Sequence, residues 1–524
     1  MGKRTDGRTG NVLKNAFWAF GAQIMIALFG FINRKVFLMH LGVELLGVNG
    51  LFSDVLSILS FADLGIGPII MFALYQPIAE ENTEKIRSLL KFYRNVYNWV
   101  IALVVIVGLA FYPFLQQINT DIPLNELRLY YWIFQVNNII GYICAYRESY
   151  VIACQHEREL TIITLISSVA LSCLQIVIVM LTSNFLLYLL LGVFVTVAKK
   201  IITNVYIINK YPETKLRGAS DISLDEKKTI FRKTSAMLVH KIGNLAINQT
   251  DSLVVSYIGN VVQWGLVSNY LMLKRIIVLI FEKIYGAMMP SMGNLIASED
   301  PSRRDRVFEM YDLANFWFCS FCFVGLSVLS SPFIHMFFGA DVLLDDITVF
   351  VFCFAFLVDG LRAPVSMMRE ASGRFEKDKW FTILAAAINL VVSIVCAKCW
   401  GIAGVFFGTI CSMLVLHVSR IILLFESGKF CYTPRLYFKR LAVYLLLSIG
   451  GYLPTMMVVS WIGDWLGVHL GSFLLMLFVV ALFPNGLYCF AFRNDNSFLA
   501  FKGIATTKVD AFIRSRRKEV KNEE

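Results

Sequence analysis

Long apolar stretches follow one another along the chain, and short polar segments separate them. A helix that spans a bilayer needs about 20 mostly apolar residues, and on this pattern the sequence predicts fourteen such helices. The expected spans are 14–33, 47–73, 96–116, 128–152, 160–182, 185–208, 234–257, 265–291, 311–333, 347–368, 380–399, 402–424, 438–462 and 468–491. The connections are too short for a separate soluble domain. The sequence therefore predicts an all-α, polytopic membrane protein.

Lys and Arg residues are unevenly distributed over the connections. If the N-terminus is cytoplasmic, the inside connections hold most of these residues, and the densest cluster runs from Lys199 through Lys233. The outside connections near 183, 259, 341 and 464 hold none. Because an excess of positive charge is typical of cytoplasmic loops, we expect both termini in the cytoplasm.

A polar and basic connection, 209–233, divides the spans into two halves. The expected parts are an N-terminal lobe of six helices at 1–208, a cytoplasmic linker at 209–233, a second six-helix lobe at 234–425, two further helices within 426–492 and a basic cytoplasmic tail at 493–524. A weak repeat supports this division, because residues 78–99 and 296–317 align without a gap and share five identical residues. Six helices separate the two copies. An even number preserves orientation, so we expect the lobes to be related by a pseudo-two-fold axis along the membrane normal.

The composition agrees with a membrane protein. Of the 524 residues, 57% are hydrophobic and 16% are charged, whereas charged residues make up about a quarter of a soluble domain. Lys and Arg in cytoplasmic loops explain the net charge of +11, so no nucleic-acid partner is expected. The eleven Cys and six His lack the spacing of a metal site, and the sequence has no GxSxG, P-loop or HExxH motif. We therefore expect no enzyme, no catalytic residue, no metal and no organic cofactor.

Charged residues inside the predicted spans are the first candidates for function. Lys274 and Arg275 lie near the middle of 265–291, where one ionised side chain costs about 2.5 to 3.5 kcal/mol on insertion scales. Such groups normally face protein or a water-filled cavity. A stripe on the seventh span carries four more polar residues at helical spacing: Lys241, Asn244, Asn248 and Asp251.

Two further helix faces are polar. The second span carries Asn49, Ser53, Ser57, Ser60 and Asp63, and the eighth carries Ser268, Arg275 and Glu282. These faces predict a shared polar cavity, although Ser and Asn also join membrane helices without any ligand. Arg34, which ends the first span, either faces this cavity or extends to the membrane surface. Arg362 is expected to pair with Asp359 in the same helix.

The region around the second span resembles a known family. From Leu41 to Tyr97 it reads LGVELLGVNGLFSDVLSILSFADLGIGPIIMFALYQPIAEENTEKIRSLLKFYRNVY. This run resembles the start of bacterial Wzx-type polysaccharide flippases of the multidrug/oligosaccharidyl-lipid/polysaccharide exporter (MOP) superfamily. The matching positions are Leu41, Gly42, Gly47, Gly50, Leu51, Phe52, Leu59, Ser60, Leu64, Gly65, Gly67, Leu74, Tyr75, Pro77, Ile78, Ala79, Phe92, Tyr93 and Tyr97. They are mostly Gly, Leu and Ser, which identify the scaffold rather than substrate contacts.

The resemblance implies two six-helix lobes around a central cavity, with two extra C-terminal helices, in the bacterial cytoplasmic membrane. It also implies transport of an undecaprenyl-diphosphate-linked oligosaccharide, a repeat unit of O-antigen, capsule or exopolysaccharide. The substrate would move from the cytoplasmic to the outer leaflet by alternating access. The implied partners are this lipid-linked substrate, membrane lipids, a polysaccharide polymerase and glycosyltransferases.

The chain's own charge pattern supplies the candidate site residues. The expected diphosphate-binding cations are Lys241, Lys274, Arg275 and Arg34, and the expected polar lining is Asn49, Ser53, Asn244, Asn248 and Ser268. The candidates for coupling to Na⁺ or H⁺ are Asp54, Asp63, Asp251 and Glu282, although each could instead partner a nearby cation.

Two other functions stay open. A MATE-type drug/cation antiporter shares the implied fold, but it would need a cavity dominated by acidic and aromatic residues, and the cations at mid-span disfavour it. An integral-membrane polysaccharide polymerase would be expected to have a sizeable outer loop, and the outer loops here are short.

Overall fold

The structure is a computed structural model in which residues 3–59, 66–228, 230, 250–297, 301–371, 379–426 and 433–500 are described. Within these ranges the chain is almost entirely helical, and no strand occurs. Two compact units divide the chain: unit 1 is Met1–Ser268 and unit 2 is Asn269–Glu524. Their boundary lies inside α9 (Val261–Ala297). The lobe limits expected from the sequence stay a prediction, because most of the start of the second lobe lies outside the described residues.

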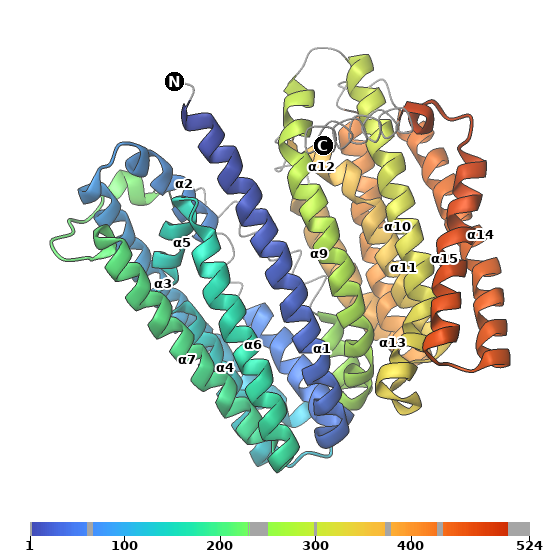
Figure 1. Ribbon diagram of the computed structural model, residues 1–524, viewed down its shortest axis with the longest axis horizontal. Coiled ribbons are helices and arrows are strands. Elements are labelled where there is room, and N and C mark those ends of the chain that lie inside the picture. Colours follow the sequence, from blue (N-terminus) through green and yellow to red (C-terminus); the bar gives the residue numbers. More distant parts are fainter. Residues whose placement is uncertain are drawn as a thin grey trace, which may run out of the picture. The chain divides into compact units, whose positions relative to one another are not determined.

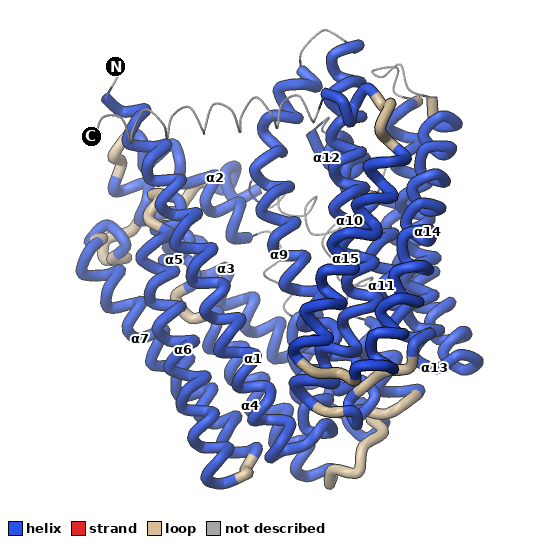
Figure 2. Tube along the Cα trace, turned by 45° about the vertical axis from the view of Figure 1, so that its right-hand side comes forward, coloured by secondary structure: helices blue, strands red, loops and turns tan. Residues whose placement is uncertain are grey.

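Unit 1 is built from helices that run side by side along much of its length (Figures 1 and 2). They are α1 (Lys3–Leu59), α2 (Ile66–Ala79), α3 (Thr83–Phe111), α4 (Leu124–Tyr142), α5 (Ala145–Ala153), α6 (Glu157–Thr182) and α7 (Phe185–Lys210), with short 3₁₀ helices η2 (Tyr112–Gln117) and η3 (Pro212–Thr214). α6 packs against α1 and α7, and α7 also packs against α4.

Unit 2 contains most of α9 and the helices that follow it. They are α10 (Pro301–Phe338), α11 (Asp346–Leu361), α12 (Ala363–Ala371), α13 (Lys379–Phe425), α14 (Pro434–Leu466) and α15 (Leu470–Ala491), with the short 3₁₀ helix η4 (Ala340–Val342) between α10 and α11. α10 packs against α11, α14 and α15, and α11 packs against α13.

Ten helices in the described part of the chain are long and apolar enough to cross a membrane. α1 and α13 each contain residues of two predicted spans, with Gly42 (φ 82°) and Gly401 (φ 58°) between them. The fourth predicted span corresponds to α4 and α5, and the seventh lies mostly outside the described residues. The all-α fold is therefore confirmed, and the helices agree with the predicted number of spans.

Gly401 marks the turn of a helical hairpin within α13. Ser393 Oγ donates a hydrogen bond to the Val405 carbonyl oxygen at 3.0 Å, and Asn389 Nδ2 donates to Thr409 Oγ1 at 3.0 Å. Both pairs are centred on the same position, so the two segments run antiparallel. Glycine suits this turn because a residue with a Cβ atom rarely adopts a positive φ.

The connections of unit 1 gather at two opposite sets of helix ends. At one set, Thr120 Oγ1 donates to Glu44 Oε1 at 2.6 Å, and Asn119 Nδ2 donates to the Gly259 carbonyl oxygen at 2.7 Å. At the other set, Lys91 forms an ion pair with Asp221 at 2.9 Å. This grouping is the one that the predicted topology requires. Which set faces the cytoplasm stays a prediction.

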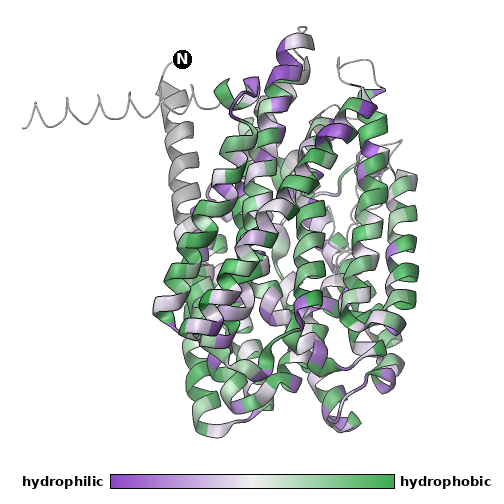
Figure 3. Ribbon diagram, turned by 90° about the vertical axis from the view of Figure 1, so that its right-hand side faces the viewer, coloured by the Kyte–Doolittle hydropathy of each residue, from purple (hydrophilic) through white to green (hydrophobic). Residues whose placement is uncertain are grey.

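Hydrophobic residues predominate along the helices, which Figure 3 colours by hydropathy, and many large apolar side chains are exposed. On α7, Leu190, Phe194 and Ile201 are 46%, 68% and 59% exposed. Extended apolar surface of this kind is typical of a helix that contacts lipid. A helix can lie in lipid because its backbone polar groups are satisfied within the helix. The chain is a multi-pass membrane protein.

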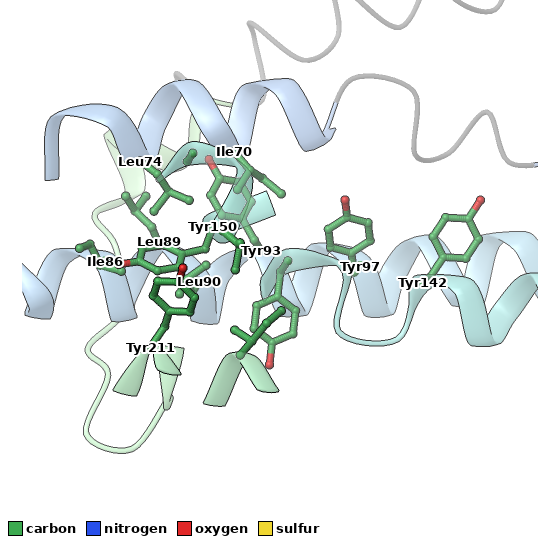
Figure 4. Close-up of a cluster of buried hydrophobic side chains, with 14 of the residues drawn as sticks. Ile70, Leu74, Ile86, Leu89, Leu90, Tyr93, Tyr97, Tyr142, Tyr150 and Tyr211 are labelled. Carbon is green, nitrogen blue, oxygen red and sulfur yellow. The ribbon is translucent and has the colours of Figure 1, made fainter. Parts of the chain in front are cut away.

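Tyrosines form much of the core at the linker end of unit 1 (Figure 4). Tyr93 of α3 and Tyr150 of α5 are buried together with Tyr211, which directly follows α7. Tyr150 also donates a hydrogen bond from its hydroxyl to Glu213 Oε1 at 2.7 Å. Burial and this hydrogen bond fix the start of the linker to the helices of unit 1.

Candidate functional site

Arg34 and Ser268 are two predicted site residues that the structure brings together. Arg34 Nη2 in α1 donates a hydrogen bond to Ser268 Oγ in α9. The Ser268 hydroxyl in turn donates to the Gly265 carbonyl oxygen in its own helix at 2.6 Å. Arg34 is half-buried and has a further interaction within the protein. In this structure the end of the first predicted span therefore contacts the start of the eighth.

Glycines allow α1 and α9 to approach closely next to this pair. A Cβ atom at Gly47 would overlap the Val261 carbonyl oxygen, and one at Gly265 would overlap the Val43 carbonyl oxygen. At Gly50 a Cβ atom would lie 3.2 Å from Trp264 Nε1. The first two turns of α9 therefore pack on the backbone of α1, which explains why they belong to unit 1.

The predicted polar face of α1 continues past these glycines. Asn49 is half-buried, and Ser53 is exposed and donates its hydroxyl hydrogen to the Asn49 carbonyl oxygen at 2.7 Å. Asp54 is buried, with 6% of its surface exposed, and interacts with other groups of the protein. Asn49 and Ser53 thus form a short polar stretch on this helix, whereas Asp54 faces protein.

Lys274 and Arg275 have different surroundings, because neighbouring residues of a helix point about 100° apart. Lys274 is half-buried, and its Nζ lies 5.3 Å from the centre of the Phe352 ring in α11. Arg275 is exposed and also has an interaction within the protein. Within unit 2, Lys274 thus faces packed helices, whereas Arg275 points out from them.

The charge of Lys274 acts on an acidic residue inside unit 2. Asp359 of α11 forms the predicted intrahelical ion pair with Arg362, which is confirmed. Lys274 and Arg420 are also close enough to interact electrostatically with the Asp359 carboxylate. Arg420 donates from Nη1 to Ser366 Oγ at 3.1 Å. One half-buried acid therefore lies among three cations within this unit.

Several predicted site residues lie outside the described residues: Lys241, Asn244, Asn248 and Asp63. Among the other coupling candidates, Asp251 is buried with 7% exposed, and Glu282 is exposed on α9. In the described part of the chain, no group of three or more His, Cys, Asp or Glu residues could hold a metal ion.

One group of charges in unit 1 was not among the predicted site residues. Lys199 and Lys200 belong to the cluster expected on the cytoplasmic side, which stays a prediction, and the structure places both within the helix α7. There Lys200 pairs with Glu148 of α5 at 2.7 Å. The available signal was the predicted span 185–208, which already contained both lysines. Their partner could not be predicted, because it lies on a helix that is distant in sequence.

Comparison with known proteins gives a family match. A family model described as "Polysaccharide biosynthesis protein" matches residues 12–296, which is more than half of the 524 residues. The match includes the stretch from Leu41 to Tyr97. By sequence alone, no curated protein matches the chain.

Solved structures with a similar fold are membrane transporters. The lipid II flippase MurJ, in an inward closed conformation, matches with a TM-score of 0.62 and 15% identity over 91% of this chain and 99% of MurJ. An inward-facing multidrug resistance MATE family transporter of the MOP superfamily matches with a TM-score of 0.59 and 15% identity over 77% of this chain and 96% of that one. A variant of the Vibrio cholerae MATE transporter VcmN matches with a TM-score of 0.53 and 12% identity over 81% of this chain and 97% of VcmN. At these identities the similarity concerns the fold, and the relatives are transporters rather than enzymes.

Proposed function

The chain belongs to the polysaccharide biosynthesis protein family, and we propose that it is a flippase for an undecaprenyl-diphosphate-linked oligosaccharide. The family match confirms the resemblance found from Leu41 to Tyr97. In this proposal the repeat unit moves from the cytoplasmic to the outer leaflet of the bacterial cytoplasmic membrane by alternating access, and both termini are cytoplasmic. The fold shared with the lipid II flippase MurJ supports a lipid-linked substrate.

Cations within the membrane helices are the observation that carries this proposal. A lipid-linked sugar can keep its chain in the bilayer, but its diphosphate and hydroxyl groups cannot cross hydrocarbon without polar partners. Arg34 of α1 and Lys274 of α9 are half-buried cations on apolar helices. Cations form strong, charge-assisted hydrogen bonds with phosphate oxygens. They would lower the barrier for the diphosphate.

The proposed roles follow the chemistry of each group. Arg34, Lys241, Lys274 and Arg275 bind the diphosphate at successive stages of transport. The sugar hydroxyls are assigned to the amide and hydroxyl groups: Asn49, Ser53, Asn244, Asn248 and Ser268. In the structure described above, Ser268 accepts a hydrogen bond from Arg34. A phosphate oxygen could replace this hydroxyl as the acceptor.

Ion coupling is assigned to acidic residues in the same helices. The candidates are Asp54, Asp63, Asp251 and Glu282. Among the described candidates, Asp54 and Asp251 are buried. Burial disfavours the charged carboxylate, and this favours binding of a proton or of Na⁺. Transport that depends on a Na⁺ or H⁺ gradient in the wild type, and no longer in Asp251→Asn, would identify that acid as the coupling residue.

A deletion strain tests the function directly. The proposal predicts that full-length lipid-linked repeat units accumulate on the inner leaflet and that surface polysaccharide disappears. Exported but unpolymerised units would indicate a polymerase instead, and drug sensitivity alone would indicate a MATE-type antiporter. If the proposal is right, the polymerase and the glycosyltransferases of the same polysaccharide are the functional partners of the chain.

Complementation of that strain tests the cations. Lys274→Gln combined with Arg275→Gln is expected to restore little or no surface polysaccharide while the protein stays in the membrane. Lys398→Gln is a matched control, because Lys398 is an exposed cation near the Gly401 turn of unit 2. Normal surface polysaccharide in the double variant would exclude this pair as the diphosphate site.

A further inference from the structure

The fourth predicted span is broken in the structure. α4 ends at Tyr142 and α5 begins at Ala145, with Cys144 in the left-handed conformation at φ 63° and ψ 12°. A non-glycine residue rarely adopts this conformation. At membrane depth, irregular backbone occurs where protein or a water-filled cavity surrounds it, and broken helices of this kind often form binding sites.

Four charged side chains lie at this break, and we name them the α5–α7 charge cluster. Arg147 and Glu148 are in the first turn of α5, and Lys199 and Lys200 are in α7. Lys200 Nζ pairs with Glu148 Oε1 at 2.7 Å, and their side chains are 13% and 29% exposed. Lys199 is half-buried and close enough to interact electrostatically with Glu148 and Lys200.

The cluster lies deep along α7. Lys199 is about 16 Å from the C-terminal end of α7, because a helix rises about 1.5 Å per residue and α7 ends at Lys210. Phe194 and Ile201, on both sides of it in sequence, are exposed apolar residues of the same helix. Ionised groups at such a depth are expensive, and they usually mark a functional site.

Arg147 is incompletely satisfied by its protein contacts. It donates from Nη1 to Asn204 Oδ1 of α7, and its guanidinium carbon lies 5.2 Å from the centre of the Tyr146 ring. Its Nε is buried and has no hydrogen-bond partner among the described residues. The half-buried guanidinium group therefore keeps one donor that no acceptor in the described part of the chain satisfies.

The charges of the cluster do not balance. Three cations face one acid, and the ion pair of Glu148 is with Lys200. Within the described residues, neither Arg147 nor Lys199 forms an ion pair with a carboxylate. Figure 4 shows Tyr97 and Tyr142 beside the loop that joins α4 and α5, so aromatic rings border the break.

We propose that the α5–α7 charge cluster binds a phosphate group of a lipid headgroup, with Arg147 and Lys199 as the ligands. Two kinds of anionic lipid carry this group: the undecaprenyl diphosphate carrier of the proposed function and a resident anionic phospholipid. Binding of the carrier rests on the proposed function, whereas binding of a resident phospholipid does not depend on it. A phosphate held between both cations would receive charge-assisted hydrogen bonds and would supply the missing negative charge.

Binding to the purified full-length protein in phosphatidylcholine nanodiscs tests this proposal. One set of nanodiscs contains added undecaprenyl diphosphate, and the other contains added phosphatidylglycerol. Arg147→Gln combined with Lys199→Gln is expected to weaken binding of one of these lipids by about tenfold or more, because two charge-assisted hydrogen bonds are lost. Loss for the carrier assigns the site to the substrate, and loss for phosphatidylglycerol assigns it to a resident lipid. Unchanged binding of both lipids overturns the proposal.

Three further variants make the result specific. Lys398→Gln removes an exposed cation elsewhere and should bind both lipids like the wild type. Glu148→Gln removes the acid and should tighten binding of the phosphate. If the Lys200–Glu148 pair has only a structural role, this variant should not bind more tightly. If the double variant does not fold, Lys199→Arg and Lys199→Gln are compared instead, and binding should survive in the first and weaken in the second. Because binding is measured without transport, it is independent of the outcome of the deletion strain.

Discussion

At one end of unit 1, α1 and α9 approach through their backbones, and at the other end, charged and hydroxyl side chains hold the linker after α7. The α1–α9 crossing depends on Gly47 and Gly265, where even one added carbon would overlap a carbonyl oxygen. The linker contacts include Lys91, which pairs with Asp221 at 2.9 Å and donates to the Ala219 carbonyl oxygen at 3.0 Å.

The two ends should therefore respond to different perturbations. Close backbone packing is limited by volume and does not depend on salt, whereas exposed ion pairs are screened by salt and contribute about 0 to 1 kcal/mol each. Lys85 and Glu226 form a second such pair at the linker end, at 2.5 Å. Ser88 and Ser220 add a hydrogen bond between hydroxyls at 2.9 Å. The crossing is thus limited by volume, and the attachment of the linker depends on charge and hydrogen bonds.

The largest effect is expected from added volume at the crossing. Gly47→Ala should destabilise the protein by about 1 to 3 kcal/mol, because overpacking forces the backbones apart. Gly30→Ala is the matched control, since a Cβ atom there meets no neighbouring atom, and it should stabilise α1 by about 0.5 to 1 kcal/mol. Thermal unfolding of the purified variants in detergent measures both. Equal unfolding temperatures for the two variants would contradict the described crossing.

A smaller effect is expected from the side-chain contact at the same crossing. Ser268→Ala removes the acceptor of the Arg34 hydrogen bond and should cost about 1 kcal/mol. Ser57→Ala is the control, because the Ser57 hydroxyl bonds to the carbonyl oxygen of Ser53 in its own helix. Thermal unfolding again distinguishes them. If Ser57→Ala lowers the unfolding temperature more than Ser268→Ala, the Arg34–Ser268 contact does not contribute as described.

At the linker end, a change of charge should have a still smaller and salt-dependent effect. Lys91→Gln removes the pair with Asp221 and should weaken linker attachment slightly, because exposed ion pairs contribute little. At low salt, a protease should cleave Lys91→Gln within 211–223 faster than it cleaves the wild type. In 1 M NaCl, cleavage of the wild type should approach the rate of the variant, because salt screens the ion pair. Lys215→Gln, an exposed change within the linker, is the control. A salt-independent rate in the wild type would show that charge does not hold the linker.

The smallest effect is expected from acid. The hydrogen bond from Lys91 lowers the pKa of Asp221, and the hydrogen bond from Lys85 lowers the pKa of Glu226. The two carboxylates therefore stabilise the attached linker at a pH above their unfolded pKa values of about 4. This stabilisation is lost as the pH falls through their lowered pKa values in the folded protein. Proteolysis of the linker by an acid-active protease should accelerate below about pH 4. Asp221→Asn combined with Glu226→Gln should remove this acceleration. If the double variant is still cleaved faster in acid, other groups cause the effect.

Local features of the molecule were predictable from the sequence. The membrane helices follow from runs of apolar residues, and the Asp359–Arg362 pair follows from a spacing of three residues within one helix. Gly47 and Gly50 were identified through the family resemblance as scaffold positions. The reason for glycine at these two positions is the close approach of α9, which is more than 200 residues away in the chain.

Features that depend on contacts between distant helices were not predictable. The break at Cys144 follows Gly141 by three residues, but a single Gly inside a helical pattern is tolerated and does not by itself predict a break. The pair of Lys200 with Glu148 requires both this break and the packing of α5 on α7. Arg34 and Ser268 were each identified as polar residues in spans, and their contact depends on the same glycine-mediated crossing.

The central claim is that cations inside the membrane helices carry a lipid-linked diphosphate across the bilayer. Proteoliposomes that contain the purified protein and an undecaprenyl-diphosphate-linked oligosaccharide test it most directly, with an impermeant sugar-modifying reagent to report the fraction of substrate in the outer leaflet. Transfer between leaflets should be fast with the wild type and with Lys398→Gln, and near the protein-free rate when Arg34, Lys274 and Arg275 are all replaced by Gln. Wild-type transfer by that folded triple variant would contradict the claim.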